Sequence, residues 1–150
     1  MAWGDTPASD KLKDIVLGGF WPDISAEKFK LRYRIPAEIP GDTITDHLRL
    51  AALTVCRQLA GWQAQQTVDT LAEVPQASVD FEGSLVPFFE RAVFCEAKAA
   101  LLRETVTVDR RPAAENAAKA GDATEDKYRE FAAEAIAAIV GSSRITVTII

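Results

Sequence analysis

The stretch that decides the fold is FFERAVFCEAKAALL, residues 88–102. Its apolar residues recur at alternating steps of four and three, a spacing typical of a helix packed in a bundle. The first apolar row comprises Phe88, Ala92, Cys95, Ala99 and Leu102, and a second row comprises Phe89, Val93 and Ala100. A helix with two apolar rows is expected to be the central one. It is predicted to start near Ser84, with Pro87 tolerated in its first turn.

A second long helix is predicted on the N-terminal side of this stretch. Thr43 and Asp46 form a variant of the capping box, so the helix is expected to begin there. Seven apolar residues then fall within roughly 100° of arc on a helical wheel. They are Ile44, Leu48, Ala51, Ala52, Val55, Leu59 and Trp62. Leu50 and Leu53 lie off this stripe, and they indicate a second contact surface, either internal or with another subunit.

Two shorter helices are predicted at the ends of the chain. The first follows an N-cap at Asp23 or Ser25 and runs through about Arg34. It carries the most basic segment of the sequence, with Lys28, Lys30, Arg32 and Arg34. The last begins with a cap at Asp122 and ends at Gly141. Its predicted apolar face comprises Tyr128, Phe131, Ala132, Ala135, Ile136 and Ile139.

The terminal sequence SSRITVTII (142–150) is rich in β-branched residues, which favours a β-strand. The strand has two possible partners. TVTV at 105–108 could pair with it, although a two-stranded ribbon is marginal alone. Alternatively, the strand could add to a sheet of another protein or subunit. Arg144, Ile145, Thr146, Val147, Thr148, Ile149 and Ile150 are therefore candidate partner-binding residues.

The segment 105–123 loses the helical periodicity and contains Pro112 and Gly121 as breakers. It is expected to form a mobile loop or a partly helical excursion. The predicted fold is thus all-α, a four-helix bundle with two long core helices, shorter helices and a C-terminal β-strand. A flexible arm is expected at 1–19 and the helical bundle at 20–141.

Composition limits the function. The chain has 150 residues, 48% of them hydrophobic, and a net charge of −5, which disfavours general binding to phosphate backbones. The N-terminus does not resemble a signal peptide, and no stretch is apolar for long enough to cross a membrane, so synthesis in the cytoplasm is expected. The Arg110–Arg111 pair could contact phosphate or a partner carboxylate, but solvated loop charges are the commoner explanation.

Candidate catalytic residues are scarce. His47 is the single histidine, so one chain cannot supply a two-histidine metal site. His47 and Cys56 are nine residues apart on one helix and therefore lie about 180° apart around its axis. Cys56 and Cys95 are expected to be buried free thiols, although a disulfide between them stays open. The sequence contains no Gly-rich phosphate loop, HExxH or GxSxG motif. It predicts neither an enzyme nor a cofactor.

The order of several short motifs is more informative than any one of them. They are FWPDI (20–24), LAEVP (71–75), FFERAV (88–93), VD (108–109) and IVGSSR (139–144). In this order the chain resembles, from about Phe20 to Ile150, the head completion protein (GpL) family of contractile-tailed phages. FFERAV is the most specific of these motifs, and none of them is catalytic.

The resemblance implies a head-to-tail adaptor at the neck of the virion. Such a protein would bind the portal protein after DNA packaging, stabilise the filled head and dock a tail completion or terminator protein. It would form a ring, commonly of twelve subunits, through which DNA passes without specific binding. Leu50, Leu53, Phe89 and Val93 are then candidate subunit-interface residues. The alternative is a cytoplasmic helical regulatory module that binds one partner protein and has no enzymatic activity.

Overall fold

The computed structural model describes residues 12–75, 85–108 and 112–141. These residues form five α-helices: α1 (Ala26–Arg32), α2 (Gly41–Gln58), α3 (Ala60–Gln63), α4 (Val86–Val108) and α5 (Pro112–Val140). A short 3-10 turn, η3 (Leu71–Glu73), lies between α3 and α4.

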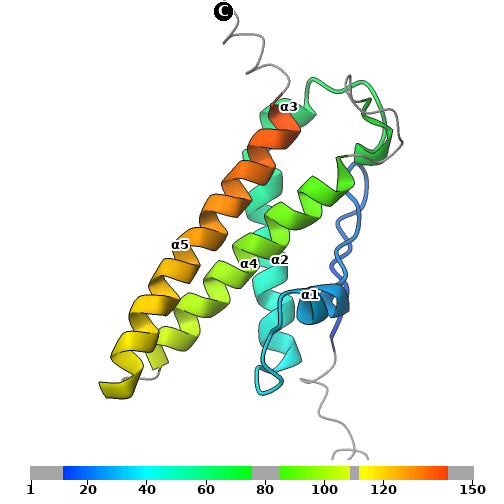
Figure 1. Cartoon of the computed structure of the whole chain (residues 1–150). Coiled ribbons are helices and arrows are strands. Elements are labelled where there is room, and N and C mark those ends of the chain that lie inside the picture. The colour runs from blue at the N-terminus through cyan, green and yellow to red at the C-terminus, as the bar shows by residue number, and fades with distance from the viewer. Residues whose placement is uncertain (1–11, 76–84, 109–111, 142–150) are drawn as a thin grey trace, which may run out of the picture.

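Helix α4 is the centre of the fold, as the sequence predicts. It packs along α5 on one side and α2 on another, and α4 and α5 run in opposite directions (Figure 1). Phe89, Val93 and Ala97 of α4 are fully buried, together with Ala92 and Cys95. The far end of the α4–α5 hairpin extends beyond the rest of the domain (Figure 1). The two helices therefore support each other there without help from α1 or α2.

Helix α2 buries the predicted stripe, since Ile44, Leu48, Ala51, Ala52, Val55 and Leu59 are all inaccessible or nearly so. The predicted capping box is wrong. The helix begins earlier, at Gly41, after Pro40 in an extended conformation, and no side chain caps it. Proline fits this place because its fixed φ suits the residue at a helix start. The predicted helix is also interrupted near its end, because α2 stops at Gln58 with Leu59 as its C-cap, and Trp62 belongs to α3.

Helix α1 starts where the sequence places it. The Ser25 hydroxyl accepts a hydrogen bond from the Lys28 backbone N–H at 3.2 Å, which satisfies one of the free donors of the first turn. The preceding chain doubles back through Gly18 and Gly19, both at positive φ, where glycine avoids the steric cost of a side chain. Two backbone hydrogen bonds of 2.9 Å then join Ile15 and Ile24. This isolated bridge holds residues 12–19, predicted as part of a loose arm, against the entry to α1.

An aromatic cluster closes the core at the start of α4. The Trp21 ring stacks on Phe89 at 4.8 Å and 16°. Phe20 packs edge-on against Trp21, and Trp62 from α3 lies 6.5 Å from Trp21. Aromatic pairs at these separations add about 0.5–1.5 kcal/mol each beyond burial. The cluster therefore joins the N-terminal segment and α3 to the central helix.

The predicted C-terminal β-strand is contradicted, because the described residues contain five helices and no β-strand beyond the single bridge of Ile15 and Ile24. The segment proposed for the strand, 142–150, lies outside the described residues. Its possible internal partner, 105–108, is the last turn of α4. β-propensity is a weak preference that helical context overrides.

The last helix is also longer than predicted, since α5 begins at Pro112 instead of Asp122. Proline suits the first helical position, and the alanine-rich residues after it have the highest helix propensity. Residues 105–123, predicted as a mobile loop or partly helical excursion, therefore contribute the end of α4 and the first turns of α5. The intervening residues 109–111 lie outside the description.

Candidate functional site

The polar side chains of the described residues do not assemble a metal-binding group. No cluster of three or more His, Cys, Asp or Glu side chains occurs within the described ranges. His47, the single histidine, lies on α2 with its Nε2 2.5 Å from the Glu104 carboxylate of α4. It therefore joins two helices of the core.

Both cysteines are free thiols, as expected, and neither is activated. Burial raises the pKa of Cys56 to about 11. Burial also raises the pKa of Cys95, although the hydrogen bond between Cys95 and Tyr33, at 3.7 Å, opposes the shift. A thiol with a raised pKa is a poor nucleophile at neutral pH. Both residues therefore act as core residues.

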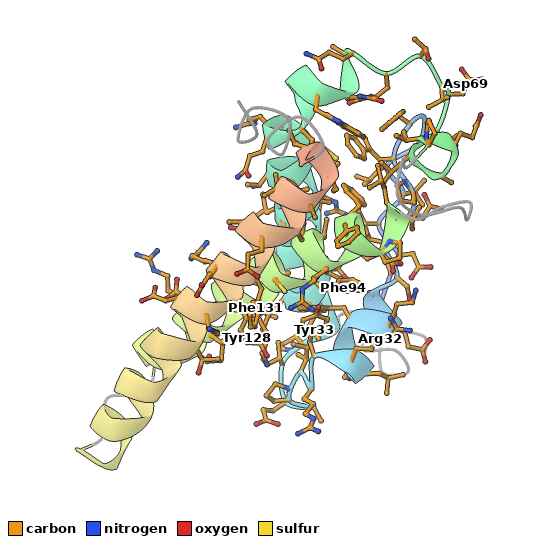
Figure 2. The ribbon with its side chains drawn as sticks, turned by 45° about the horizontal axis from the view of Figure 1, so that its top comes forward. Arg32, Tyr33, Asp69, Phe94, Tyr128 and Phe131 are labelled. Atoms are coloured by element: carbon orange, nitrogen blue, oxygen red, sulfur yellow. The ribbon has the colours of Figure 1, made fainter. Side chains whose placement is uncertain are left out.

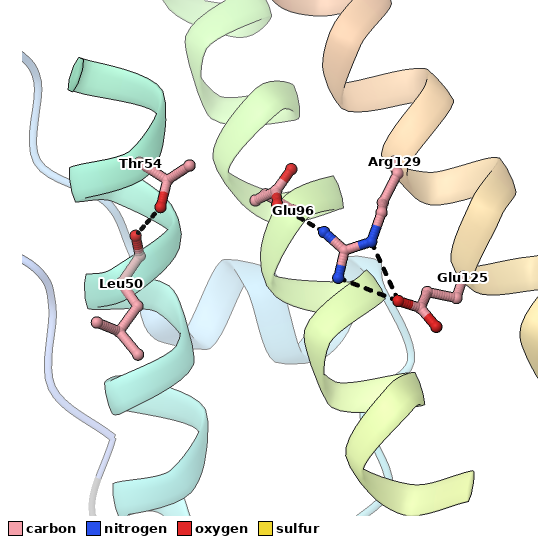
Figure 3. Close-up of polar contacts among 5 residues, drawn as sticks. All are labelled: Leu50, Thr54, Glu96, Glu125 and Arg129. Atoms are coloured by element: carbon pink, nitrogen blue, oxygen red, sulfur yellow. Dashed lines mark hydrogen bonds and ion pairs between the residues drawn. The ribbon is translucent and has the colours of Figure 1, made fainter. Parts of the chain in front are cut away.

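The outer face of α2 carries two exposed leucines. Leu50 is 61% exposed and Leu53 is 51% exposed, so no described part of the chain covers them. The Thr54 hydroxyl donates to the Leu50 carbonyl at 2.8 Å, which satisfies this polar group within the helix (Figure 3). Asp46 and Arg49 form an exposed ion pair one turn earlier. Leu50 and Leu53 therefore form a small apolar patch in which the Thr54 hydroxyl is already hydrogen-bonded within the helix.

Phe89 and Val93, the other two candidate interface residues, are placed differently. Both are fully buried in the core of the chain itself. These two side chains of the second apolar row thus face inward and offer no surface to a neighbouring subunit. The periodicity was correct, but it could not tell an internal contact from an external one.

A polar clamp joins α5 to α4 beside this core. The Arg129 guanidinium donates to Glu96 of α4 at 2.8 Å and also pairs with Glu125 of its own helix at 3.0 Å (Figure 3). A guanidinium shared between two carboxylates fixes the rotation of α5 against α4. The clamp is structural, because all three charges are used within the chain.

A groove between α1 and α4 was not identified from the sequence. Its floor and walls come from Tyr33 at the end of α1 and Phe88 and Phe94 of α4, with Arg32 and Arg91 on its rim. It encloses about 280 Å³. Figure 2 shows that Tyr33, Phe94, Tyr128 and Phe131 gather at this junction of α1, α4 and α5. In the sequence, the basic residues of the first helix indicate positive charge in this region. Only the fold shows which aromatic residues of other helices lie beside them.

Buried polar contacts fix the wall of this groove. Tyr33 packs against Phe29, Phe94 and Tyr128, with ring centroids 5.5–6.1 Å apart. Burial, together with the hydrogen bond to Cys95, raises the pKa of the Tyr33 phenol, so the phenol stays neutral. Lys98 donates to the Tyr33 carbonyl at 3.0 Å, and burial lowers the pKa of this lysine. Tyr33 is therefore held in one position.

Other predicted contact residues cannot be placed. The terminal segment 144–150 and the Arg110–Arg111 pair lie outside the described residues. Of the helices that the structure describes, none combines the length and apolar character needed to span a membrane.

Sequence comparison relates the chain to known phage proteins. A 105-residue stretch is 30% identical to a "Probable head completion/stabilization protein" of Haemophilus phage HP1 (strain HP1c1), covering 68% of this chain and 70% of that protein. No solved structure matches the chain. The profile of the phage head completion protein (GPL) family matches residues 15–150. The chain therefore belongs to the phage head completion protein family, whose members are structural proteins of the phage head.

Proposed function

We propose that this protein binds the portal vertex after DNA packaging, stabilises the filled head and presents the surface to which a tail completion protein docks. Membership of the head completion family supports the stabilisation of the filled head. In this role the protein acts at the head–tail interface of the virion as a ring of identical subunits, with twelve as the expected number.

The observation that carries the proposal is the leucine pair on α2. Leu50 and Leu53 are one helical turn apart and mostly exposed, on the side of α2 that faces away from the core. Apolar residues concentrated on a helix surface are typical of the centre of a subunit contact. We assign this face of α2 to the contact between neighbouring subunits.

Two further contacts belong to the same proposal. Residues 144–150 would contact the portal protein or a neighbouring subunit, and Arg110 with Arg111 would pair with carboxylates of a partner. The net charge of −5 supports passage of DNA through the ring, because a negative lumen repels phosphate and allows the genome to slide.

The test replaces both leucines by charged residues. A phage that lacks this gene is supplied with either the wild-type protein or the Leu50→Glu/Leu53→Glu variant. The variant is expected to stay folded, because both positions are exposed. It is expected to lower the yield of stable DNA-filled heads by at least tenfold, and native mass spectrometry with purified portal rings is expected to show no bound ring of the variant.

The matched control is Leu31→Glu, which places the same charge at a leucine that is 74% exposed on α1. The control is expected to complement as well as wild type. Normal head yield and normal ring formation by the double variant would show that the α2 face is not the subunit contact. A wild-type protein that never binds portal rings would reject the wider proposal.

A further inference from the structure

The cationic side chains around the α1–α4 groove are used unequally. Lys28 of α1 pairs with Glu90 of α4 at 3.0 Å, which neutralises the one carboxylate of the groove. Arg32 and Arg91 make no ion pair with any acid in the described parts of the chain. By contrast, Arg129 holds two carboxylates. The groove therefore has an excess positive charge in a chain whose net charge is −5.

The interior of the groove is aromatic. Tyr33 and Phe94 form a packed wall, and Phe88 stays 40% exposed at its edge. Arg91 lies over the Phe131 ring, 4.9 Å from its centroid, so the guanidinium is oriented while its outer N–H groups stay available. Arg32 and Tyr33 are labelled at the end of α1 in Figure 2, where this wall begins.

The volume and the charge of the α1–α4 groove indicate which kind of ligand it binds. A space of about 280 Å³ is smaller than a typical pocket for a drug-sized ligand but holds one large apolar side chain. Arginine presents a planar fork that matches a carboxylate. We propose that this groove docks a protein segment in which an aromatic or large aliphatic residue enters the groove and an adjacent Asp or Glu pairs with Arg32 and Arg91.

A protein segment fits better than nucleic acid. Duplex binding relies on many phosphate contacts, whereas this groove offers two guanidinium groups, Arg32 and Arg91, that form no ion pair among the described residues. The aromatic floor also has the combination of arginine and aromatic residues that is enriched in protein–protein contacts. The groove acts independently of the leucine pair on α2, so it can be tested separately from ring formation.

The experiment selects random twelve-residue peptides displayed on yeast against the immobilised full-length protein. Selected peptides are expected to carry Asp or Glu next to Trp, Phe or Leu. Fluorescence anisotropy is then expected to give a Kd at least tenfold weaker for Arg32→Glu and for Arg91→Glu. The control Arg57→Glu, an exposed arginine on α2, is expected to bind within twofold of wild type.

Arg91→Glu also removes the contact with Phe131, so circular dichroism checks its folding, and Arg32→Glu, at an exposed position, decides the result if Arg91→Glu unfolds. Three results would overturn the proposal. The first is the absence of any enriched peptide, or enrichment without acidic residues. The second is equal binding by wild type and Arg32→Glu. The third is displacement of the peptide by a 20-base-pair duplex with the same dependence on Arg32, which would assign the groove to phosphate.

Discussion

Replacing Phe89 by alanine distinguishes a core residue from an interface residue. The Phe89 side chain is fully buried and stacks on Trp21. Transferring such a side chain out of water contributes about 1.5–3 kcal/mol, and the cavity left by its removal adds to the loss. Phe89→Ala is therefore expected to lower the free energy of unfolding by about 3–5 kcal/mol. This is a large part of the ~5–15 kcal/mol typical of a domain.

The neighbouring Phe88 provides the matched control. It has the same side chain on the same helix, but it is 40% exposed. Phe88→Ala therefore loses only about three fifths of the transfer free energy of a buried phenylalanine, and its removal leaves no closed cavity. It is expected to lower the free energy of unfolding by about 1–2 kcal/mol. Urea unfolding followed by far-UV circular dichroism measures both. At ~2–4 °C per kcal/mol, Phe89→Ala should lower the Tm by roughly 6–20 °C.

The measurement is repeated over a range of protein concentrations, because self-association would add to the apparent stability. The reasoning is refuted if Phe89→Ala costs no more than Phe88→Ala. If Phe89→Ala instead leaves the monomer stable and prevents oligomer formation, the side chain belongs to a subunit interface, as its sequence pattern first suggested.

Three further changes test other parts of the structure. Arg129→Ala removes the clamp between α5 and α4 and is expected to cost about 0.5–1 kcal/mol, less in 1 M NaCl; an equal loss for Lys127→Ala, whose ion pair is exposed, would contradict this. Cys56, with its pKa of about 11 instead of 9.0, should be alkylated by iodoacetamide at pH 8 roughly 100-fold more slowly in the folded protein than in urea. Because the folded state holds this proton more tightly, stability should also fall as the pH rises above the unfolded pKa of 9.0; equal alkylation rates would refute both statements. Ala135→Leu overfills a buried position on α5 and should cost about 1–3 kcal/mol by urea unfolding, whereas exposed Ala133→Leu should stay within about 0.5 kcal/mol; similar values for the two would show that α5 is loosely packed.

The sequence predicts the helices whose apolar residues are large and periodic. The stripe from Ile44 to Leu59 is buried as expected, and α4 is the central helix. Alanine and small polar residues carry no such periodic signal, so the sequence leaves the first ten residues of α5 open between a mobile loop and a partly helical excursion. In the sequence Pro112 indicates a break between helices, although proline is also a favourable first residue of a helix.

The surfaces were harder to predict than the helices. Leu50 and Leu53 could be identified because they depart from the stripe of their own helix. The α1–α4 groove could not, because it joins Tyr33 to Phe94, which are distant in sequence and meet only through tertiary packing. Periodicity describes one helix at a time, and a groove between two helices depends on how their faces are paired.

The α4–α5 hairpin also has a consequence for the order of folding. Its two helices follow each other in the chain, so their pairing closes only a short loop and has a low contact order. Stacking of Trp21 on Phe89 closes a much longer loop and carries a larger entropic cost. The hairpin is therefore expected to belong to the folding nucleus, and φ-values near zero at Ala135 would contradict this. Newly made chains would then recruit their N-terminal half onto a scaffold built from the α4–α5 hairpin, which is synthesised after it.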